Sequence, residues 1–224
     1  MEEKFLTYFH LSGFPITKEQ EGKIESYLRE LKRWGQKTNL TALKDDEAII
    51  KILFIESFSF SKALPGRTAG EILDYGSGAG FPGLPLKILY PSLKITLLER
   101  SSKKWSFLKH ICRELDFGDV VCLKQSGEEL IGQQKFQEKF EVIVSRGVGH
   151  MANILKIGKI LLKKEGLLVI QKPMDYPASP EDREGIKENI EAGEKRIWGR
   201  DTIVWECPEL GLAHRLELFK KCFT

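Results

Sequence analysis

Three glycines at alternate positions, Gly76, Gly78 and Gly80, follow a short apolar run that ends in the acid Asp74. Glycine is the residue type that lets a backbone turn sharply and approach a ligand closely. In an open sheet of parallel strands, ligands bind at the carboxyl ends of the strands, where such a loop would lie. The spacing therefore predicts a loop that receives a nucleotide-like cofactor.

The same stretch has a second possible register, Gly78-x-Gly80-x-x-Gly83, which matches the dinucleotide-binding fingerprint. In that register the strand would continue through Gly76, and the Asp74 carboxylate would lie near a pyrophosphate, where a negative charge is unfavourable. S-adenosylmethionine instead carries a sulfonium and an ammonium, which an acid can accompany. Asp74 thus favours S-adenosylmethionine and a methyltransferase. A nicotinamide-dependent oxidoreductase and a tight turn without a ligand are the alternatives.

Glu99 ends a second apolar run, residues 94–99. In both cofactor classes, an acid at the end of the second strand accepts hydrogen bonds from the ribose hydroxyls. The alternative is a surface carboxylate that pairs with Arg100 or Lys103. The position of Glu99 directly after two leucines favours the cofactor role.

The elements that must position these residues alternate between strands and helices from residue 71 onward. Strands are expected at residues 71–74, 94–99, 119–123, 141–145, 166–171, 202–207 and 215–219. Helices are expected at residues 84–89, 101–115, 154–164 and 182–192. This order predicts an α/β fold with a doubly wound, seven-stranded, mostly parallel sheet, the Rossmann-like architecture of class I methyltransferases.

The segment before residue 67 has apolar residues at helical spacing over residues 18–37 and 45–58, with Thr17 as a capping candidate. Pro65-Gly66 ends it. We therefore expect an N-terminal helical cap over residues 1–66, followed by one compact S-adenosylmethionine-binding methyltransferase domain over residues 67–224.

The composition narrows the class of protein further. The 224 residues carry a net charge of +3, which permits a nucleic-acid partner without requiring one. The four cysteines form no C-x-x-C pair, so neither a metal site nor a disulfide framework is expected. No signal peptide or membrane-spanning run is visible. We expect a cytoplasmic monomer that does not bind a membrane.

The glycine loop continues as Phe81-Pro82-Gly83-Leu84-Pro85, which is far more specific than glycines alone. Together with residues 34–41, 96–99 and 103–108 and with Ser145-Arg146-Gly147, this stretch resembles the RsmG family, also called GidB. The resemblance implies methyl transfer from S-adenosylmethionine to N7 of a guanine in 16S ribosomal RNA, with S-adenosylhomocysteine as product. The implied partner is this RNA or the small ribosomal subunit.

The resemblance also places cofactor contacts on Gly76, Phe81, the pair Gly127-Glu128 and Arg146. Phe81 and Gly127-Glu128 would flank the adenine, and Arg146 would lie near the transferred methyl group; the alternative for Arg146 is a structural ion pair. The full set of predicted cofactor-binding residues is Asp74, Gly76, Gly78, Gly80, Phe81, Glu99, Gly127, Glu128 and Arg146.

Guanine N7 has a free lone pair at neutral pH, so its methylation needs alignment rather than a general base. No catalytic base is expected, and Arg146 is the nearest candidate for a catalytic role. Basic residues at the same sheet edge, Arg100, Lys103 and Lys172, are the expected RNA contacts, unless they form a solvated surface. Methylation of another RNA or of a small molecule, and binding without catalysis, are the remaining alternatives.

The chain departs from the usual pattern of the family at four positions. Leu53 and Glu56 stand where the family usually has His and Asp, Gly147 replaces Ala, and Pro173 replaces Gly. We expect these departures to concern the helical cap and the RNA-facing loop rather than the cofactor site.

Overall fold

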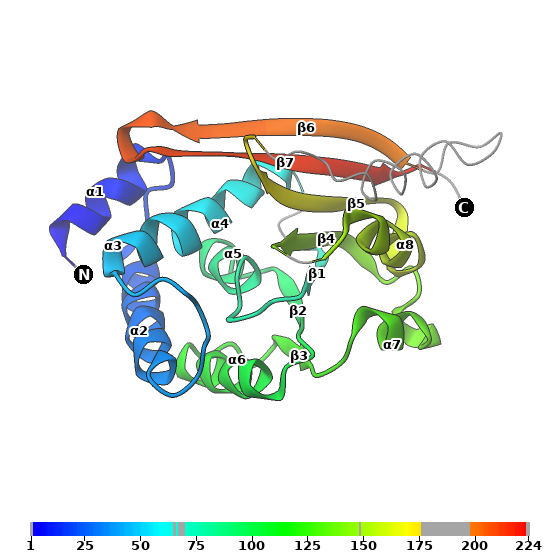
Figure 1. Ribbon diagram of the computed structural model, residues 1–224, viewed down its shortest axis with the longest axis horizontal. Helices are drawn as coiled ribbons and strands as arrows, with labels where there is room; N and C mark the ends of the chain where they lie inside the picture. Colours follow the sequence, from blue (N-terminus) through cyan, green and yellow to red (C-terminus); the bar gives the residue numbers. More distant parts are fainter. Residues whose placement is uncertain (1, 65, 67–69, 148, 176–197, 223–224) are drawn as a thin grey trace.

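Seven strands form one sheet in the order β3-β2-β1-β4-β5-β7-β6 (Figure 1). The structure is a computed structural model that describes residues 2–64, 66, 70–147, 149–175 and 198–222. The strands are β1 (Glu71–Tyr75), β2 (Lys94–Leu98), β3 (Val121–Leu123), β4 (Phe140–Arg146), β5 (Leu162–Pro173), β6 (Trp198–Cys207) and β7 (Leu212–Lys221). Strands β1 to β5 are parallel, and β7 is antiparallel to both of its neighbours. The predicted α/β sheet is confirmed.

Helices precede the sheet and connect its strands. They are α1 (Glu3–Leu11), α2 (Lys18–Gly35), α3 (Asp46–Ala48), the π-helical segment η1 (Ile49–Ile55), α4 (Glu56–Ser59), α5 (Gly83–Leu89), α6 (Ser102–Glu114), α7 (Gly127–Ile131) and α8 (Met151–Leu161). Short 3₁₀ turns lie at Phe60–Ala63 (η2), Gln134–Phe136 (η3) and Pro208–Leu210 (η4). Thr17 caps α2 as predicted, through a capping box with Gln20. None of the helices in the described ranges is long and apolar enough to cross a bilayer.

The strands bury both faces, as a sheet with helices on each side requires. In β1, Ile72 packs into one buried cluster and Leu73 into another; Val142 and Ile143 of β4 divide in the same way. The first cluster contains the apolar faces of α1, α2, η1, α5 and α6, and the second contains those of α7 and α8. Residues of β1 and β4 are thereby fixed from both sides, and so is the edge at which these strands end.

The N-terminal helices share the first cluster with the sheet. Ile24 of α2 and Phe54 of η1 belong to the same group of buried side chains as Ile95 of β2 and Trp205 of β6. Figure 1 shows α1, α2 and α3 gathered at one end of the molecule, next to α6 and the long β6–β7 pair. The boundary between residues 66 and 67 stays a prediction, because the core runs across it without interruption.

The structure differs from the predicted elements in several places. The expected helix at residues 154–164 ends at Leu161, where β5 begins, and Glu165 then takes a left-handed backbone with φ of 61°. The expected helix at residues 45–58 is divided by the π-helical segment. The short helix α7 was not predicted. The expected helix at residues 182–192 lies outside the described residues.

Candidate active site

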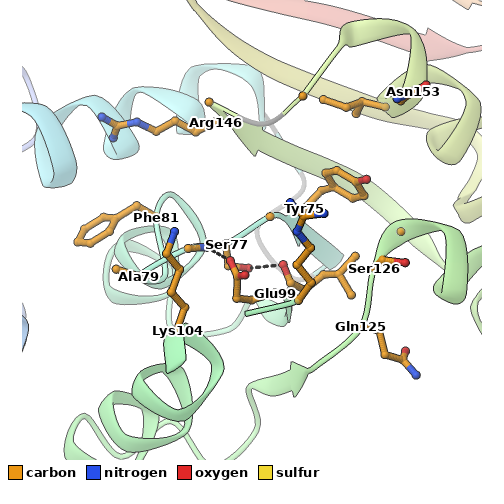
Figure 2. Close-up of a pocket in the computed structure, with 18 of the residues that line it drawn as sticks. Tyr75, Ser77, Ala79, Phe81, Glu99, Lys104, Gln125, Ser126, Arg146 and Asn153 are labelled. Carbon is orange, nitrogen blue, oxygen red and sulfur yellow. Dashed lines mark hydrogen bonds between the residues drawn. The ribbon is translucent and has the colours of Figure 1, made fainter. Parts of the chain in front are cut away.

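A cavity of about 600 Å³ opens at the carboxyl ends of β1, β2 and β4 (Figure 2). This is the edge at which ligands bind in open α/β sheets. Its lining comes from the glycine loop, the ends of β2 and β4, the loops before α7 and α8, and the cap. The lining residues are Leu40, Thr41, Leu53, Tyr75, Gly76, Ser77, Gly78, Ala79, Phe81, Leu98, Glu99, Arg100, Lys104, Gln125, Ser126, Gly127, Glu128, Arg146, Gly147, Gly149, His150, Asn153 and Ile154.

The glycine loop connects β1 to α5 and turns through backbone conformations that side chains disfavour. Gly78 has φ of 58° and faces open space, because a Cβ there would meet only the Gly76 carbonyl at 3.9 Å. Gly80 has φ of 98°, and a Cβ there would lie 2.4 Å from the Tyr27 hydroxyl and 2.7 Å from Leu84. Gly80 therefore lets the loop pack against the cap, whereas Gly78 leaves room on the cavity side.

The buried side chain of Asp74 anchors this loop. Its side chain is fully buried, and Oδ2 accepts a hydrogen bond of 2.8 Å from the backbone N–H of Gly83, at the start of α5. Burial raises the pKa of this carboxyl to about 7, although the Gly83 N–H opposes the shift. Asp74 and Gly80 do not belong to the cavity lining. The structure thus assigns both residues to the shape of the loop, and direct contact of either with a cofactor stays a prediction.

Glu99 lies at the cavity wall, where the sequence predicted it. It follows the end of β2 and is 8% exposed. One carboxylate oxygen accepts the Gly78 N–H at 2.9 Å (Figure 2). The other accepts the Ser101 N–H at 2.7 Å. Each oxygen has further lone pairs for a ligand hydroxyl. Glu99 is therefore held rigidly at the place from which it could bind a ribose.

Phe81 supplies an apolar part of the wall. Its ring is 7% exposed and stacks on Tyr27 of α2 with a centroid distance of 5.0 Å and an angle of 16°. Phe54 meets the same ring edge to face at 5.2 Å. Two cap residues thus fix the predicted adenine-flanking ring.

The opposite wall includes the start of α7, with Gly127 and Glu128, whose contact with adenine stays a prediction. Ser126 and Glu129 form a capping box that fixes the helix start. A Cβ on Gly127 would approach Ile157 and the Tyr75 ring to 2.6 Å. Glycine at this position therefore allows α7 to pack directly against β1 and α8.

Arg146 ends β4, and Figure 2 shows its side chain reaching over the cavity toward the side on which Phe81 lies. Its Nη2 is 3.4 Å from a carboxylate oxygen of Glu56. Its Nη1 is buried and has no hydrogen-bond partner among the described residues. Burial lowers the pKa of the guanidinium, while Glu56 and Asp74 oppose this shift. Arg146 thus lines the cavity and also forms an ion pair, which was the alternative for it; its place near the transferred methyl group stays a prediction.

The predicted RNA contacts divide between two environments. Arg100 lines the cavity and is exposed, and Lys104 of α6 lines it as well (Figure 2). Lys103 is exposed on α6 but outside the cavity lining. Lys172 is only 8% exposed, opposite Arg215 of β7. This burial disfavours Lys172 as an RNA contact, and Lys104 is better placed than Lys103.

Three of the four departures from the family lie at the cavity or next to it, and the expectation that they spare the cofactor site stays a prediction. Leu53 and Gly147 line the cavity, and Glu56 contacts Arg146. Pro173 is exposed at the end of β5.

Several cavity residues were not predicted as site residues. Thr41 could have been suggested by its place in the N-terminal signature at residues 34–41. Gln125 and Asn153 carry no such signal, because only the folded chain brings the loops before α7 and α8 to this edge. His150 also lines the cavity. In the described part of the chain, no group of three or more His, Cys, Asp or Glu side chains could hold a metal ion.

Comparison with known proteins identifies the family. The model of the family GidB, rRNA small subunit methyltransferase G, matches residues 20–184. The chain belongs to this family. A ribosomal RNA small subunit methyltransferase G of Clostridium botulinum (strain Loch Maree / Type A3) is 34% identical over 196 residues, which cover 88% of this chain and 80% of that protein. Its counterpart in Syntrophus aciditrophicus is 38% identical over 170 residues, 75% of this chain and 70% of that one.

The fold of this GidB-family chain also occurs in solved methyltransferase structures. The precorrin-6y C5,15-methyltransferase of Geobacter metallireducens superposes with a TM-score of 0.52 and 15% identity, over 74% of this chain and 87% of that chain. This likeness shows the class I methyltransferase fold. The dinucleotide register requires a strand that continues to Ser77, but β1 ends at Tyr75. The structure therefore favours the register that begins at Asp74.

Proposed function

We propose that this protein transfers the methyl group of S-adenosylmethionine to N7 of a guanine in 16S ribosomal RNA. The observation that carries the proposal is the family match over residues 20–184. This range contains the whole cavity lining, from Leu40 of the cap to Ile154 of α8. The relatives that share this range are named ribosomal RNA small subunit methyltransferase G.

The residues at the cavity fit S-adenosylmethionine. The space beside Gly78 would be filled by a Cβ, and the loop therefore admits a ligand against its backbone. The Glu99 carboxylate suits ribose hydroxyls, and Phe81 with Gly127 suits the flat, apolar faces of adenine. The buried Nη1 of Arg146, which has no hydrogen-bond partner in the described ranges, suits a carboxylate such as that of the methionine part.

S-adenosylmethionine supplies an electrophilic methyl group when it is bound. The chain's own residues bind and orient, because the N7 lone pair needs no proton removed. Glu99 is committed to two backbone N–H groups, which keeps it a binding rather than a proton-transfer group. Arg100 and Lys104, which line the cavity, would attract the phosphates of RNA. This arrangement suits a nucleophile such as guanine N7, which can attack the methyl group without first losing a proton.

The deciding experiment incubates the protein and S-adenosylmethionine with small-subunit RNA or subunits that lack the modification. N7-methylguanine is then mapped by chain scission, with an enzyme-free control. We expect scission at a single guanine. Binding of S-adenosylmethionine without scission above the control would favour a different methyl acceptor. Binding of NADH without any response to S-adenosylmethionine would overturn the proposal.

A further inference from the structure

Glu56 occupies the centre of a polar cluster next to the cavity. The cluster, which we call the Arg146 support, consists of Glu56 from α4, Arg146 from β4, Gln171 from β5 and His214 from β7. The segment before Glu56 is π-helical, and the Glu56 N–H donates to the Lys51 carbonyl five residues earlier. π-Helical turns are uncommon and occur frequently at functional sites.

The two oxygens of the Glu56 carboxylate have different neighbours. Oε2 accepts a hydrogen bond of 2.8 Å from Gln171 Nε2 and lies 3.4 Å from Arg146 Nη2. Oε1 lies 4.0 Å from Nδ1 of His214. Because the Glu56 and Arg146 side chains are only 13% and 18% exposed, solvent screens this ion pair weakly. Gln171 thus holds the carboxylate at the place from which it faces the guanidinium.

His214 does not compete with Arg146 as a second cation. Burial, together with the charge of Arg146, lowers its pKa to about 4, so the imidazole is neutral at neutral pH. Its Nε2 is 2.7 Å from the Ser59 hydroxyl, and its ring lies 5.1 Å from that of Trp205. Within the described part of the chain, the carboxylate of Glu56 therefore pairs with one cation, the Arg146 guanidinium.

The geometry leaves Arg146 with one nitrogen paired and one available. Nη2 faces Glu56, whereas Nη1 is buried without a hydrogen-bond partner among the residues that the structure describes, at a side chain that lines the cavity. An arginine side chain loses rotamer entropy when it becomes ordered. A guanidinium that is already held loses little more when a ligand binds, which raises affinity.

We propose that Glu56, clamped by Gln171, is a positioning residue that holds Arg146 so that Nη1 meets the bound ligand in the cavity. The inference rests on the proposed function, because S-adenosylmethionine is the ligand used to test it. Glu56 acts through Arg146 and does not itself belong to the cavity lining.

The test measures S-adenosylmethionine affinity by calorimetry in wild type, Glu56→Gln, Arg146→Met and the double variant. Glu56→Gln should weaken binding about tenfold, the size of a lost charge-assisted hydrogen bond. In the Arg146→Met background, the same change should alter affinity by less than about twofold, because the two residues act as one unit. Unchanged affinity in Glu56→Gln, or two independent and additive losses, would overturn the proposal.

Glu217→Gln is the matched control for loss of a buried carboxylate. Glu217 is 2% exposed on β7 and is 2.9 Å from Arg200, outside the cavity lining. This variant should lower the thermal midpoint and leave the affinity for S-adenosylmethionine unchanged. If it weakens binding as much as Glu56→Gln does, the effect is general destabilisation and the proposal fails.

Two milder variants keep the test decisive if Glu56→Gln does not fold. Glu56→Asp retains the charge. This variant should bind S-adenosylmethionine at least about threefold more tightly than Arg146→Met, in which the guanidinium is absent. Gln171→Met removes the clamp and should weaken binding about threefold. Wild-type affinity in Gln171→Met would overturn the clamp. Failure of the wild-type protein to bind S-adenosylmethionine would count against the proposed function, whereas failure of these comparisons counts against Glu56 alone.

Discussion

The phenol hydroxyl of Tyr27, on helix α2, donates a hydrogen bond of 2.5 Å to the carbonyl oxygen of Ala79 in the glycine loop. Both residues are buried, and the Tyr27 ring also stacks on Phe81. Helix α2 therefore holds the backbone of the predicted cofactor loop. Cofactor binding should depend on a residue that lies 52 positions away in the sequence.

Tyr27→Phe should weaken S-adenosylmethionine binding about threefold to tenfold, because the buried Ala79 carbonyl loses its partner while the ring stacking is retained. Calorimetry measures the affinity, and urea denaturation measures the accompanying loss of stability. Tyr90→Phe, outside the cavity lining, is the matched control and should bind like wild type. Equal affinity in the two variants would show that the hydrogen bond does not shape the loop.

The two central glycines should respond differently to alanine. Gly80→Ala forces a Cβ into the Tyr27 hydroxyl, whereas the nearest atom to the Cβ of Gly78→Ala among the described residues is the Gly76 carbonyl oxygen, at 3.9 Å. Both carry the cost of a left-handed backbone, about 1 kcal/mol. Gly80→Ala should therefore reduce the free energy of unfolding by at least about 1 kcal/mol more than Gly78→Ala, as measured in urea. The reverse order would contradict the packing of the loop against α2.

Gly78→Asp should abolish S-adenosylmethionine binding and retain the fold. The new side chain would extend into the open space beside Gly78, and its charge would lie close to the Glu99 carboxylate. Calorimetry should show no binding heat, while the circular dichroism spectrum stays that of wild type. Wild-type affinity in this variant would refute the assignment of the loop.

Asp74 predicts a pH dependence of stability. Its pKa rises from 3.8 to about 7 on folding, mainly because burial favours the neutral acid. The stability that it contributes is thus fully present below about pH 4 and is lost as the pH rises through about 7. Asn stays neutral at every pH. The free energy of unfolding of Asp74→Asn, relative to that of wild type, should therefore rise by a few kcal/mol between about pH 4 and about pH 8. Urea denaturation across this range measures the difference, and a constant difference would argue against a buried titrating carboxyl.

Substitution of Arg100 should affect RNA binding, whereas substitution of Lys172 should affect stability. Arg100→Gln removes an exposed charge at the cavity and should raise the KM for RNA substrate by about threefold to tenfold, with a shallower salt dependence. Lys172→Gln changes a buried residue and should mainly lower the thermal midpoint. Methylation assays at two salt concentrations check the first effect. If Lys172→Gln also flattened the salt dependence, Lys172 would contact RNA after all.

The parts of the site that depend on local pattern could be predicted from the sequence. Apolar runs identified the strands, and the acids at their ends led to Asp74 and Glu99. The direction of the Asp74 side chain could not be assigned in this way, because the loop after it folds back so that Gly83 donates to it.

Partners from distant segments were beyond local reasoning. Glu56 and Gln171 are 115 residues apart, and neither has a pattern that predicts the other. Lys172 looked exposed at a strand end, but β7 pairs beside it and buries it. The π-helical segment before Glu56 was likewise hidden, because its apolar spacing also fits an α-helix.

The core shared by the N-terminal helices and the sheet affects how the chain folds during its synthesis. Phe14 packs against Phe58, and also against Trp205, with ring centroids 6.2 Å apart. The Cys207 thiol lies 3.8 Å from the Leu11 carbonyl. Because β6 is synthesised long after α1, the apolar side chains that follow α1 stay partly uncovered until β6 has left the ribosome. The nascent N-terminal helices should therefore remain protease-sensitive until β6 has been made and has packed against them.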